Sequence, residues 1–361
     1  MWRVRIAGVF IFLFVTGGVL GCRSGGPVTP AALTVTDALG RTVTLPAPPR
    51  RIAIVGRANF MIADAVYTFP EARERVVAIS GTPQGNIFQA LMDPHSAEKV
   101  QLKRDPGPEQ IAAVHPDLVL MKHFLAKKLG QSVESLGIPV IYMSLETPDT
   151  FRREIKMLGI LFNNPDRARE VNAFYQRLIE TITQRVGSIP PEKRPAVLVL
   201  QHSTKGGSTA YKIPPLTWIQ TLMVKTAGGR VAWADATLGS RWTVITLEHI
   251  AAWNPDQIYI VDYFGDPREA VQQFTQEETA RRLRAVQTHH VFAFPKDVVS
   301  WDQPDTRWVL GLVWLARHIH PEVFADVDMT RVYLDFYRTL YGLDESTVRE
   351  HLMPTITGDW P

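Results

Sequence analysis

The sequence is poor in residues on which several classes of protein depend. Cys22 is the only cysteine among 361 residues, which excludes a disulfide framework, a redox dithiol and a zinc site built from cysteines. The formal net charge is only +3, and no long run of lysine and arginine is present, so binding to nucleic acid is not indicated. The apolar run from Ile6 to Leu20 is shorter than the roughly 20 residues that span a bilayer.

Sequence motifs of the common enzyme classes are also missing. The chain has no Gly-x-Ser-x-Gly elbow, no Walker-type phosphate-binding loop and no His-Glu-x-x-His zinc motif. The segment HSTKGG places its glycines after Lys205 and so lacks the geometry of a phosphate-binding loop. We therefore predict that the protein is not an enzyme and has no cofactor of its own.

The N-terminus has the layout of a secretory signal. Arg3 and Arg5 precede the apolar run, which ends in small residues before a polar, glycine-rich segment. The tetrapeptide Val-Leu-Gly-Cys that ends at Cys22 resembles a bacterial lipobox, in which the cysteine becomes the lipid-bearing N-terminus. We predict a signal peptide over residues 1–22, a flexible tether over 23–32, and a folded part held outside the cytoplasm by lipid on Cys22.

Short apolar runs bounded by turn residues alternate with helical stretches along the rest of the chain. A hairpin is predicted over Leu33–Leu45. Further strands are predicted at Ile52–Val55, Val76–Ile79, Leu118–Met121, Val140–Met143, Ala196–Leu200, Ile258–Val261 and Val291–Phe294. The C-terminus reads as helical, over Trp308–Ile319, Thr330–Tyr341 and Glu345–Leu352. Strands that alternate with helices are typical of covered parallel sheets, so the pattern predicts the α/β class.

The stretch from Asn164 to Val186 carries the signals of one uninterrupted helix. Asn164 is suited to cap the first turn, and Pro165 stands where no N–H is needed. Apolar side chains then recur at helical spacing, at Val171, Phe174, Tyr175, Leu178, Ile182 and Val186. A helix of this length spans about 33 Å, so we expect it to join two halves of the molecule.

An internal repeat indicates that these halves are related. Glu109–Asp117, EQIAAVHPD, is matched in one register by Glu248–Asp256, EHIAAWNPD. We predict two parallel-sheet α/β lobes bridged by a single long α-helix, with a ligand cleft between the lobes. The expected bounds are 33–148 for the N-terminal lobe, 149–187 for the bridging helical segment and 188–361 for the C-terminal lobe with its helical end.

Several stretches together resemble one family. The lipobox, TVTDALGRTVTLPAPPRRIAIVG, PDLVLM, LGIPVIYM, the long helix and GSRWTVITLEHIAAWNPDQIYI are similar to the class III solute-binding proteins of ABC importers, which carry iron siderophores, haem and cobalamin. The resemblance implies a monomer that binds a metal chelate between its lobes and delivers it to a permease and its ATPase. It also implies that Glu109 and Glu248, one on each lobe, dock on permease arginines; charges at an interface rim steer a transient partner.

The candidate ligand-binding residues come from the repeat and the resemblance together. Ligands of open α/β sheets bind beyond the carboxyl ends of strands, which makes the segment Lys122-His123-Phe124 the counterpart of Val261-Asp262-Tyr263. The same displacement pairs Lys103 with Trp242, and in cobalamin-binding relatives the position of Trp242 lines the pocket. A flat aromatic wall suits a corrin, porphyrin or catecholate. We expect aromatic contacts from Trp242, Tyr263 and Trp301, and contacts to anionic groups from Arg57, Lys103, Lys122, Lys205 and Arg241.

Two alternatives change the ligand. The segment 301–324, WDQPDTRWVLGLVWLARHIHPEVF, resembles a sub-branch of the same family that includes molybdate and tungstate binders. A zinc or manganese importer subunit would instead use His123, His202 and Asp262 as ligands. In every case one rigid bridging helix predicts little closure of the lobes when ligand binds.

Overall fold

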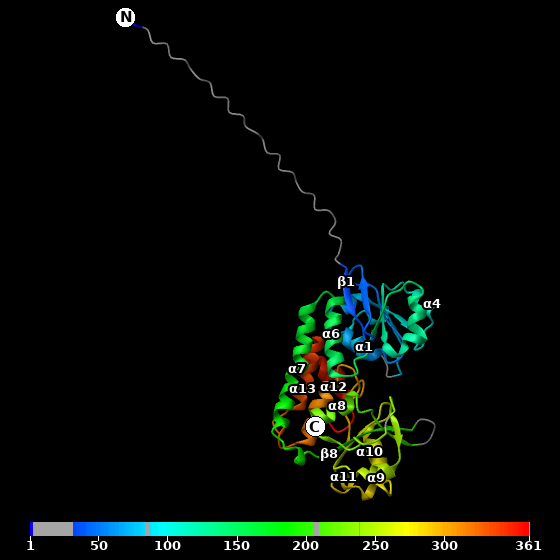
Figure 1. The fold of residues 1–361 in the computed structure, drawn as a ribbon, viewed down its shortest axis with the longest axis vertical. Helices are drawn as coiled ribbons and strands as arrows, with labels where there is room; N and C mark the ends of the chain where they lie inside the picture. Colours follow the sequence, from blue (N-terminus) through cyan, green and yellow to red (C-terminus); the bar gives the residue numbers. More distant parts are fainter. Residues whose placement is uncertain (3–31, 84–86, 205–208, 238, 361) are drawn as a thin grey trace.

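The computed structural model describes residues 1–2, 32–83, 87–204, 209–237 and 239–360 (Figure 1). The signal peptide, Cys22 and most of the tether therefore lie outside the described residues. Among the residues that are described, no helix is both long and apolar enough to cross a membrane. The chain forms two lobes, each built on its own sheet, and we call them the N-lobe and the C-lobe.

The N-lobe contains five parallel strands in the order β5-β4-β3-β6-β7. Their bounds are β3 Ile52–Ile54, β4 Val76–Ser80, β5 Val100–Leu102, β6 Leu118–Lys122 and β7 Val140–Met143. Side chains alternate between the two faces as strand geometry requires: Ile52 and Ile54 belong to one apolar cluster, Ala53 to a second one on the other face. The predicted strands of this lobe are confirmed, whereas β5, which has two exposed residues, was not predicted.

Short elements cover this sheet. The predicted hairpin is present as antiparallel β1 Leu33–Thr36 and β2 Thr42–Leu45. The helices are α1 Asn59–Val66, α2 Ala72–Arg75, α3 Ile87–Met92, α4 Pro108–Ala112 and α5 Gln131–Glu134. A π-turn at Ala126–Gly130 directly precedes α5, so the helical stretch before β7 is not a regular α-helix throughout. Position 130 requires glycine, because a Cβ added there would collide with the Tyr142 side chain.

The C-lobe sheet is mixed, unlike that of the N-lobe. Its strands are β8 Ala196–Ser203, β9 Ala210–Ile213, β10 Arg230–Val231, β11 Thr243–Ile245, β12 Gln257–Val261 and β13 Val291–Ala293. β8, β12 and β13 pair in parallel, as expected, and β10, which was not predicted, also pairs with β8 in parallel. β9 and β11 add an antiparallel edge. The accompanying helices are α8 Ile219–Thr226, α9 Leu247–Trp253, α10 Pro267–Gln276 and α11 Arg284–Gln287.

The long helix is confirmed as α7, Pro165–Gly187. The Asn164 side chain accepts a hydrogen bond from the Arg167 backbone N–H at 3.0 Å, which caps the first turn as predicted. α7 packs against α6 Pro148–Leu161, α8, α12 Trp308–Ile319 and α13 Met329–Tyr341. In Figure 1, α7 runs down one side of the molecule beside both lobes, so the bridge is the longest member of a helical layer. A short helix α14, Glu345–Thr347, and a π-turn at Val348–Leu352 follow.

One apolar cluster extends through both lobes. It joins inner side chains of the N-lobe sheet, such as Ile54, to those of the C-lobe sheet, such as Leu198, through the buried stripe of α7 and nearly all of α12. A second, smaller cluster lies only on the outer face of the N-lobe sheet. The two lobes therefore share a core along the helical layer.

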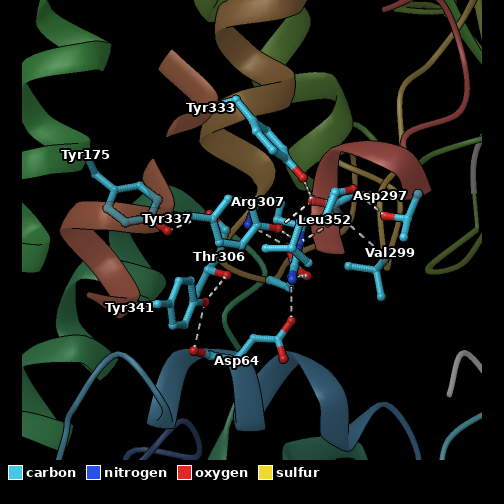
Figure 2. Close-up of polar contacts among 12 residues, drawn as sticks. Asp64, Tyr175, Asp297, Val299, Thr306, Arg307, Tyr333, Tyr337, Tyr341 and Leu352 are labelled. Atoms are coloured by element: carbon cyan, nitrogen blue, oxygen red, sulfur yellow. Dashed lines mark hydrogen bonds and ion pairs between the residues drawn. The ribbon is translucent and has the colours of Figure 1, made fainter. Parts of the chain in front are cut away.

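A buried polar cluster around Arg307 joins the lobes beside this core. Arg307 is fully buried, and its guanidinium contacts three carboxylates: Asp64 of α1 at 2.5 Å, Asp297 at 2.9 Å and Asp305 at 3.1 Å. Figure 2 shows Asp64 approaching from α1 below, while Tyr333, Tyr337 and Tyr341 of α13 surround the arginine. Its charge also lies 4.3 Å from the centre of the Phe88 ring.

The same cluster extends along α13 to α7. The Tyr341 hydroxyl donates to the Asp64 carbonyl at 3.0 Å, and the Tyr175 hydroxyl of α7 donates to the Thr306 carbonyl at 2.5 Å. Burial raises the pKa of both Asp64 and Asp305 above the ordinary range, although the charge of Arg307 opposes the shift. The cluster thus connects α1, α7 and α13 through hydrogen bonds among buried residues.

Candidate ligand-binding site

A cavity of about 980 Å³ lies between the lobes, at the carboxyl ends of the central strands. From the N-lobe it is lined by Arg57, Ala58, Met61, Lys122, His123, Phe124, Leu125, Lys128 and Glu146. From the C-lobe it is lined by Gln201, Lys212, Trp218, Gln220, Ser240, Arg241, Trp242, Tyr263, Gln303 and Pro304. The placement follows the general rule for open α/β sheets.

Two of the predicted basic residues already have carboxylate partners. Arg57 forms a two-pronged ion pair with Asp105, at 2.7 and 2.9 Å, which raises the pKa of Arg57 and lowers that of Asp105. Lys122 is fully buried; its ammonium donates to the Ser144 carbonyl and lies 2.9 Å from Glu146. These two charges are therefore largely neutralised before any ligand arrives.

Three further cations of the lining are unpaired. The charged groups of Lys128, Lys212 and Arg241 make no ion pair or hydrogen bond within the part of the chain that the structure describes. Lys128 comes from the N-lobe and the other two from the C-lobe, so they face the cavity from both sides. The cavity consequently carries an excess positive charge that suits an anion.

The C-lobe side of the cavity is a row of aromatic rings. Trp218 and Trp242 meet edge to face with centroids 5.9 Å apart, and Trp242 and Tyr263 do the same at 6.2 Å. Edge-to-face contacts of this kind hold rings in fixed orientations. Trp242 and Tyr263 were predicted for this wall, and Trp218 was not.

A buried carboxylate, Asp302, accepts a hydrogen bond from one ring of this row. Asp302 is fully buried and accepts hydrogen bonds from Tyr263 at 2.8 Å, Gln220 at 3.0 Å and Ser300 at 2.5 Å. Burial raises the pKa of Asp302, and the three hydrogen bonds oppose that shift. Burial and the neighbouring Asp302 also raise the pKa of Tyr263, so its hydroxyl remains a donor.

Of the predicted ligand-binding residues, two lie away from the cavity and one lies outside the described residues. Trp301 is fully buried and packs against Tyr333 and Trp360, so its expected place on the cavity wall needs correction: the indole belongs to the C-lobe core. Lys103 is exposed and is not among the lining residues, because it follows the edge strand β5. Lys205 lies outside the described residues.

The ligands expected for a zinc or manganese site are not brought together. His123 lines the cavity, whereas His202 and Asp262 do not and instead pair with each other at 2.8 Å. Burial opposes ionisation of Asp262, but hydrogen bonds from His202 and from the Gly265 and Phe264 backbone outweigh it and lower the Asp262 pKa. Within the described ranges, no group of three His, Cys, Asp or Glu side chains is arranged to hold a metal ion.

The two glutamates of the repeat occupy matching places. Glu109 is the second residue of α4, which leads into β6, and Glu248 is the second residue of α9, which leads into β12. Both are exposed. A hydrogen bond with Thr246 lowers the pKa of Glu248. The helix, turn and strand of the repeat are therefore present in both lobes.

Sequence reasoning missed five lining residues that matter chemically: Lys128, Lys212, Trp218, Gln220 and Gln303. Lys212 lies on the unpredicted strand β9, where strand alternation separates it from the buried Tyr211 and Ile213. Gln303 follows Asp302 in the segment that sequence analysis singled out for its family resemblance. The family resemblance of that segment could therefore have indicated Gln303 as a candidate lining residue.

Comparison with known proteins accounts for this architecture. The family model described as "Periplasmic binding protein" matches residues 52–298, which include both sheets and the bridging helix. The chain belongs to the periplasmic binding protein family. The class III form expected from the sequence, with its two α/β lobes, is confirmed.

Relatives of this periplasmic binding protein have different named ligands. The molybdate-binding protein MolA of Haemophilus influenzae is 23% identical over 345 residues, covering 86% of this chain and 93% of its own. Its molybdate-bound structure superposes with a TM-score of 0.71, at 20% identity over 86% of this chain and 98% of that one. The iron-uptake system-binding protein of Bacillus subtilis is 20% identical over 319 residues, 85% of this chain and 95% of its own.

Another solved structure matches a larger share of this periplasmic binding protein than the MolA structure does. A solute-binding protein from Veillonella parvula has a TM-score of 0.70 and 24% identity, covering 90% of this chain and 99% of that one. At such identities the likeness establishes the fold. Proteins of this family are non-enzymatic, extracytoplasmic components of ABC transport systems that bind small molecules.

Proposed function

We propose that the protein captures an anionic metal chelate, such as a ferric siderophore or haem, and delivers it to an ABC importer. The observation that carries this proposal is the composition of the cavity: three unpaired cations face a row of three aromatic rings. A chelate of this kind has anionic oxygens and flat apolar faces, and the cavity offers a partner for each. Among the expected chelates, cobalamin fits the cationic lining least well.

The size of the cavity supports the same assignment. Pockets of about 300–1,000 Å³ are typical for small organic ligands, and this one measures about 980 Å³. A bare tetrahedral oxyanion would contact only part of such a lining. The rings of Trp218 and Trp242 would then gain no apolar contact from the ligand.

Binding assays with the Trp242→Ala variant test the proposal. Tryptophan fluorescence should be quenched when a ferric catecholate or haem is added, with metal content checked on the protein as purified. Trp242→Ala should weaken the chelate by about 30-fold, on the order of 2 kcal/mol of aromatic contact. Trp253→Ala, at a tryptophan of α9 that is not among the cavity-lining residues, is the matched control. If no chelate binds, or if both variants bind it equally, the assignment is wrong.

A molybdate or tungstate oxyanion is the second candidate. The named ligand of the Haemophilus influenzae relative favours it, and so do the unpaired cations. In that case molybdate should bind more tightly than any chelate, and Trp242→Ala should leave its affinity unchanged within about twofold, because no ring face is needed.

Docking on the permease is assigned to Glu109 and Glu248. Their matching, exposed positions on the two lobes support this part of the proposal. Replacing both with lysine should abolish uptake in cells and leave ligand affinity intact, because neither lines the cavity. Uptake that persists in the double variant would remove the assignment. We also propose that lipid on Cys22 keeps the protein at the membrane surface.

A further inference from the structure

A smaller pocket, which we call the side pocket, adjoins the cavity between the lobes. The two linings share Arg57, Ala58, Met61, Tyr263 and Gln303. The side pocket extends past the ends of β3 and β4 toward the end of β5, as far as Gly81 and Arg104. Its volume is about 220 Å³, below the range of about 300–1,000 Å³ that is typical for a whole small ligand. It therefore suits a substituent of a ligand that is held mainly in the cavity.

Apolar side chains from both lobes line the side pocket. Phe60 and Met61 of α1 and Pro83 line it from the N-lobe, and Phe264 lines it from the C-lobe. Phe60 is buried, whereas Phe264 is 78% exposed. One exposed apolar side chain is ordinary on a protein surface, but this ring borders a pocket whose N-lobe wall is also apolar. An apolar ligand group between the two walls would remove the ring from water, which is favourable.

Hydrogen bonds hold the loop that carries this exposed ring. The Asp262 carboxylate accepts the backbone N–H of Phe264 at 2.9 Å and that of Gly265 at 2.7 Å. The Lys296 ammonium donates to the carbonyl oxygens of Asp262, at 3.3 Å, and Gly265, at 2.5 Å. A ring on a fixed backbone loses less conformational freedom on binding than a ring on a mobile loop. The loop is thus prepared to present Phe264 to a ligand.

The charges of the side pocket narrow what it can accept. Among its described lining residues the only charged side chains are Arg57, which pairs with Asp105, and Arg104, which is exposed. Both are cations, and no carboxylate is among those lining residues to offset them. A cationic group would be repelled here. An uncharged apolar group has the walls described by Phe60, Pro83 and Phe264 as partners.

We propose that the side pocket binds an uncharged apolar arm, aryl or alkyl, that projects from the metal-binding core of the chelate, and that Phe264 is the specificity-determining residue that recognises this arm. The inference rests on the proposed function of chelate capture. It narrows the ligand class to chelates that carry such an arm beyond the groups that bind the metal.

The test compares two ferric complexes of equal charge. Their chelators are the ortho-dihydroxybenzoyl amides of glycine and of phenylalanine, which share the catechol and the carboxylate and differ only in a benzyl arm. In the wild-type protein, quenching of tryptophan fluorescence should give a dissociation constant about tenfold lower for the phenylalanine complex, because the arm buries apolar surface. In Phe264→Ala this ratio should fall to about one, whereas Phe264→Tyr keeps the ring and should keep the ratio.

Phe124→Ala is the matched control. Phe124 is 53% exposed and follows β6 as Phe264 follows β12, but it lines the cavity and not the side pocket. Its replacement should change both affinities by the same factor and preserve the ratio. Because the Phe264 ring is largely in water, Phe264→Ala should unfold in urea at the same midpoint as the wild type, which separates loss of the contact from loss of the fold.

The outcomes distinguish this inference from the function on which it rests. Equal affinities for the two complexes in the wild type, or a ratio that survives in Phe264→Ala, would overturn the role of the side pocket. If the glycine complex binds while the ratio is one, only this inference fails and chelate capture stands. If neither complex binds, the inference fails, and the absence of haem binding as well would remove the proposed function with it.

Discussion

Two groups of charged side chains lie between the lobes, and they differ in sign and in how completely they are paired. Around Arg307, one cation faces three carboxylates, and all four side chains are buried. In the cavity, Lys128, Lys212 and Arg241 face the open space without a carboxylate partner in the described part of the chain. By formal charge, carboxylates outnumber cations in the first group, whereas the second consists of cations alone.

The difference separates a structural contact from a binding site. Charges taken out of water are tolerated only when other groups satisfy them. Around Arg307 the three carboxylates, the Tyr337 hydroxyl and the Phe88 ring supply most of what is needed, and only Nη2 has no hydrogen-bond partner among the described residues. The cavity cations keep contact with water and can exchange it for a ligand. A buried cluster whose charges pair with one another holds the lobes together, whereas cations without a carboxylate partner are available to an anion.

The largest effect is expected from removing the buried arginine. Arg307→Met leaves three carboxylates without a cation and should lower the free energy of unfolding by about 3–5 kcal/mol. Arg57→Met breaks an ion pair whose partners are each 49% exposed, and it should cost no more than about 1 kcal/mol. Urea unfolding followed by fluorescence measures both. Equal losses would show that burial does not distinguish the two arginines.

A somewhat smaller effect is expected at a buried carboxylate of α6. Burial raises the pKa of Glu154 to about 7, although backbone hydrogen bonds from Ser144 and the charge of Lys122 oppose the shift. Because the folded-state pKa is raised, the stability that this group contributes is present below its unfolded pKa of about 4.3 and is lost as pH rises through 7. Between about pH 5 and pH 8 the wild type should lose on the order of 3 kcal/mol relative to Glu154→Gln.

Unfolding free energies of the two proteins at several pH values measure that difference. A gap that stays constant across the range would mean that Glu154 does not titrate there. Glu170→Gln, at an exposed glutamate of α7, is the matched control and should follow the wild type.

A moderate effect is expected from the unpaired cations. Lys212→Met should weaken binding of a ferric catecholate about 3- to 10-fold at about 0.1 M salt, and the difference should shrink in about 1 M salt because the charge faces water. Lys225→Met, at an exposed lysine of α8 that does not line the cavity, should have no effect. A loss of affinity that does not depend on salt would contradict an electrostatic role for Lys212.

The smallest effect is expected in the overall dimensions of the molecule when a ligand binds. The shared core and the Arg307 cluster tie the lobes together along α7, so the radius of gyration should change by little more than the error of solution scattering when a chelate binds. A large decrease would mean that these contacts open and close with the ligand.

Sequence reasoning predicted the fold well where signals were local. The apolar strands, the Asn164 cap and the stripe of α7 follow from periodicity and end signals, and the repeat around Glu109 and Glu248 revealed two lobes. Strands β9 and β11 escaped prediction because they are short and partly polar. Such strands depend on pairing partners far along the chain.

The site was only partly predictable, for a related reason. Residues at predicted strand ends, such as Lys122 and Tyr263, are indeed found at the cavity. Trp301 could not be placed, because nothing local distinguishes a tryptophan on a wall from one in a core. Arg307 likewise gave no signal: its importance arises from Asp64, which is distant in sequence and adjacent only in the folded molecule.

The core that runs through both lobes has a consequence for how the molecule unfolds. Because side chains from both sheets belong to one large cluster along α7 and α12, most of the interior is shared between the lobes, and melting should occur as one cooperative transition. A ligand in the cleft contacts both lobes, so its binding energy adds to the stability of the entire fold. An extracytoplasmic protease would then meet a molecule whose resistance to cleavage rises in both lobes when the ligand is bound.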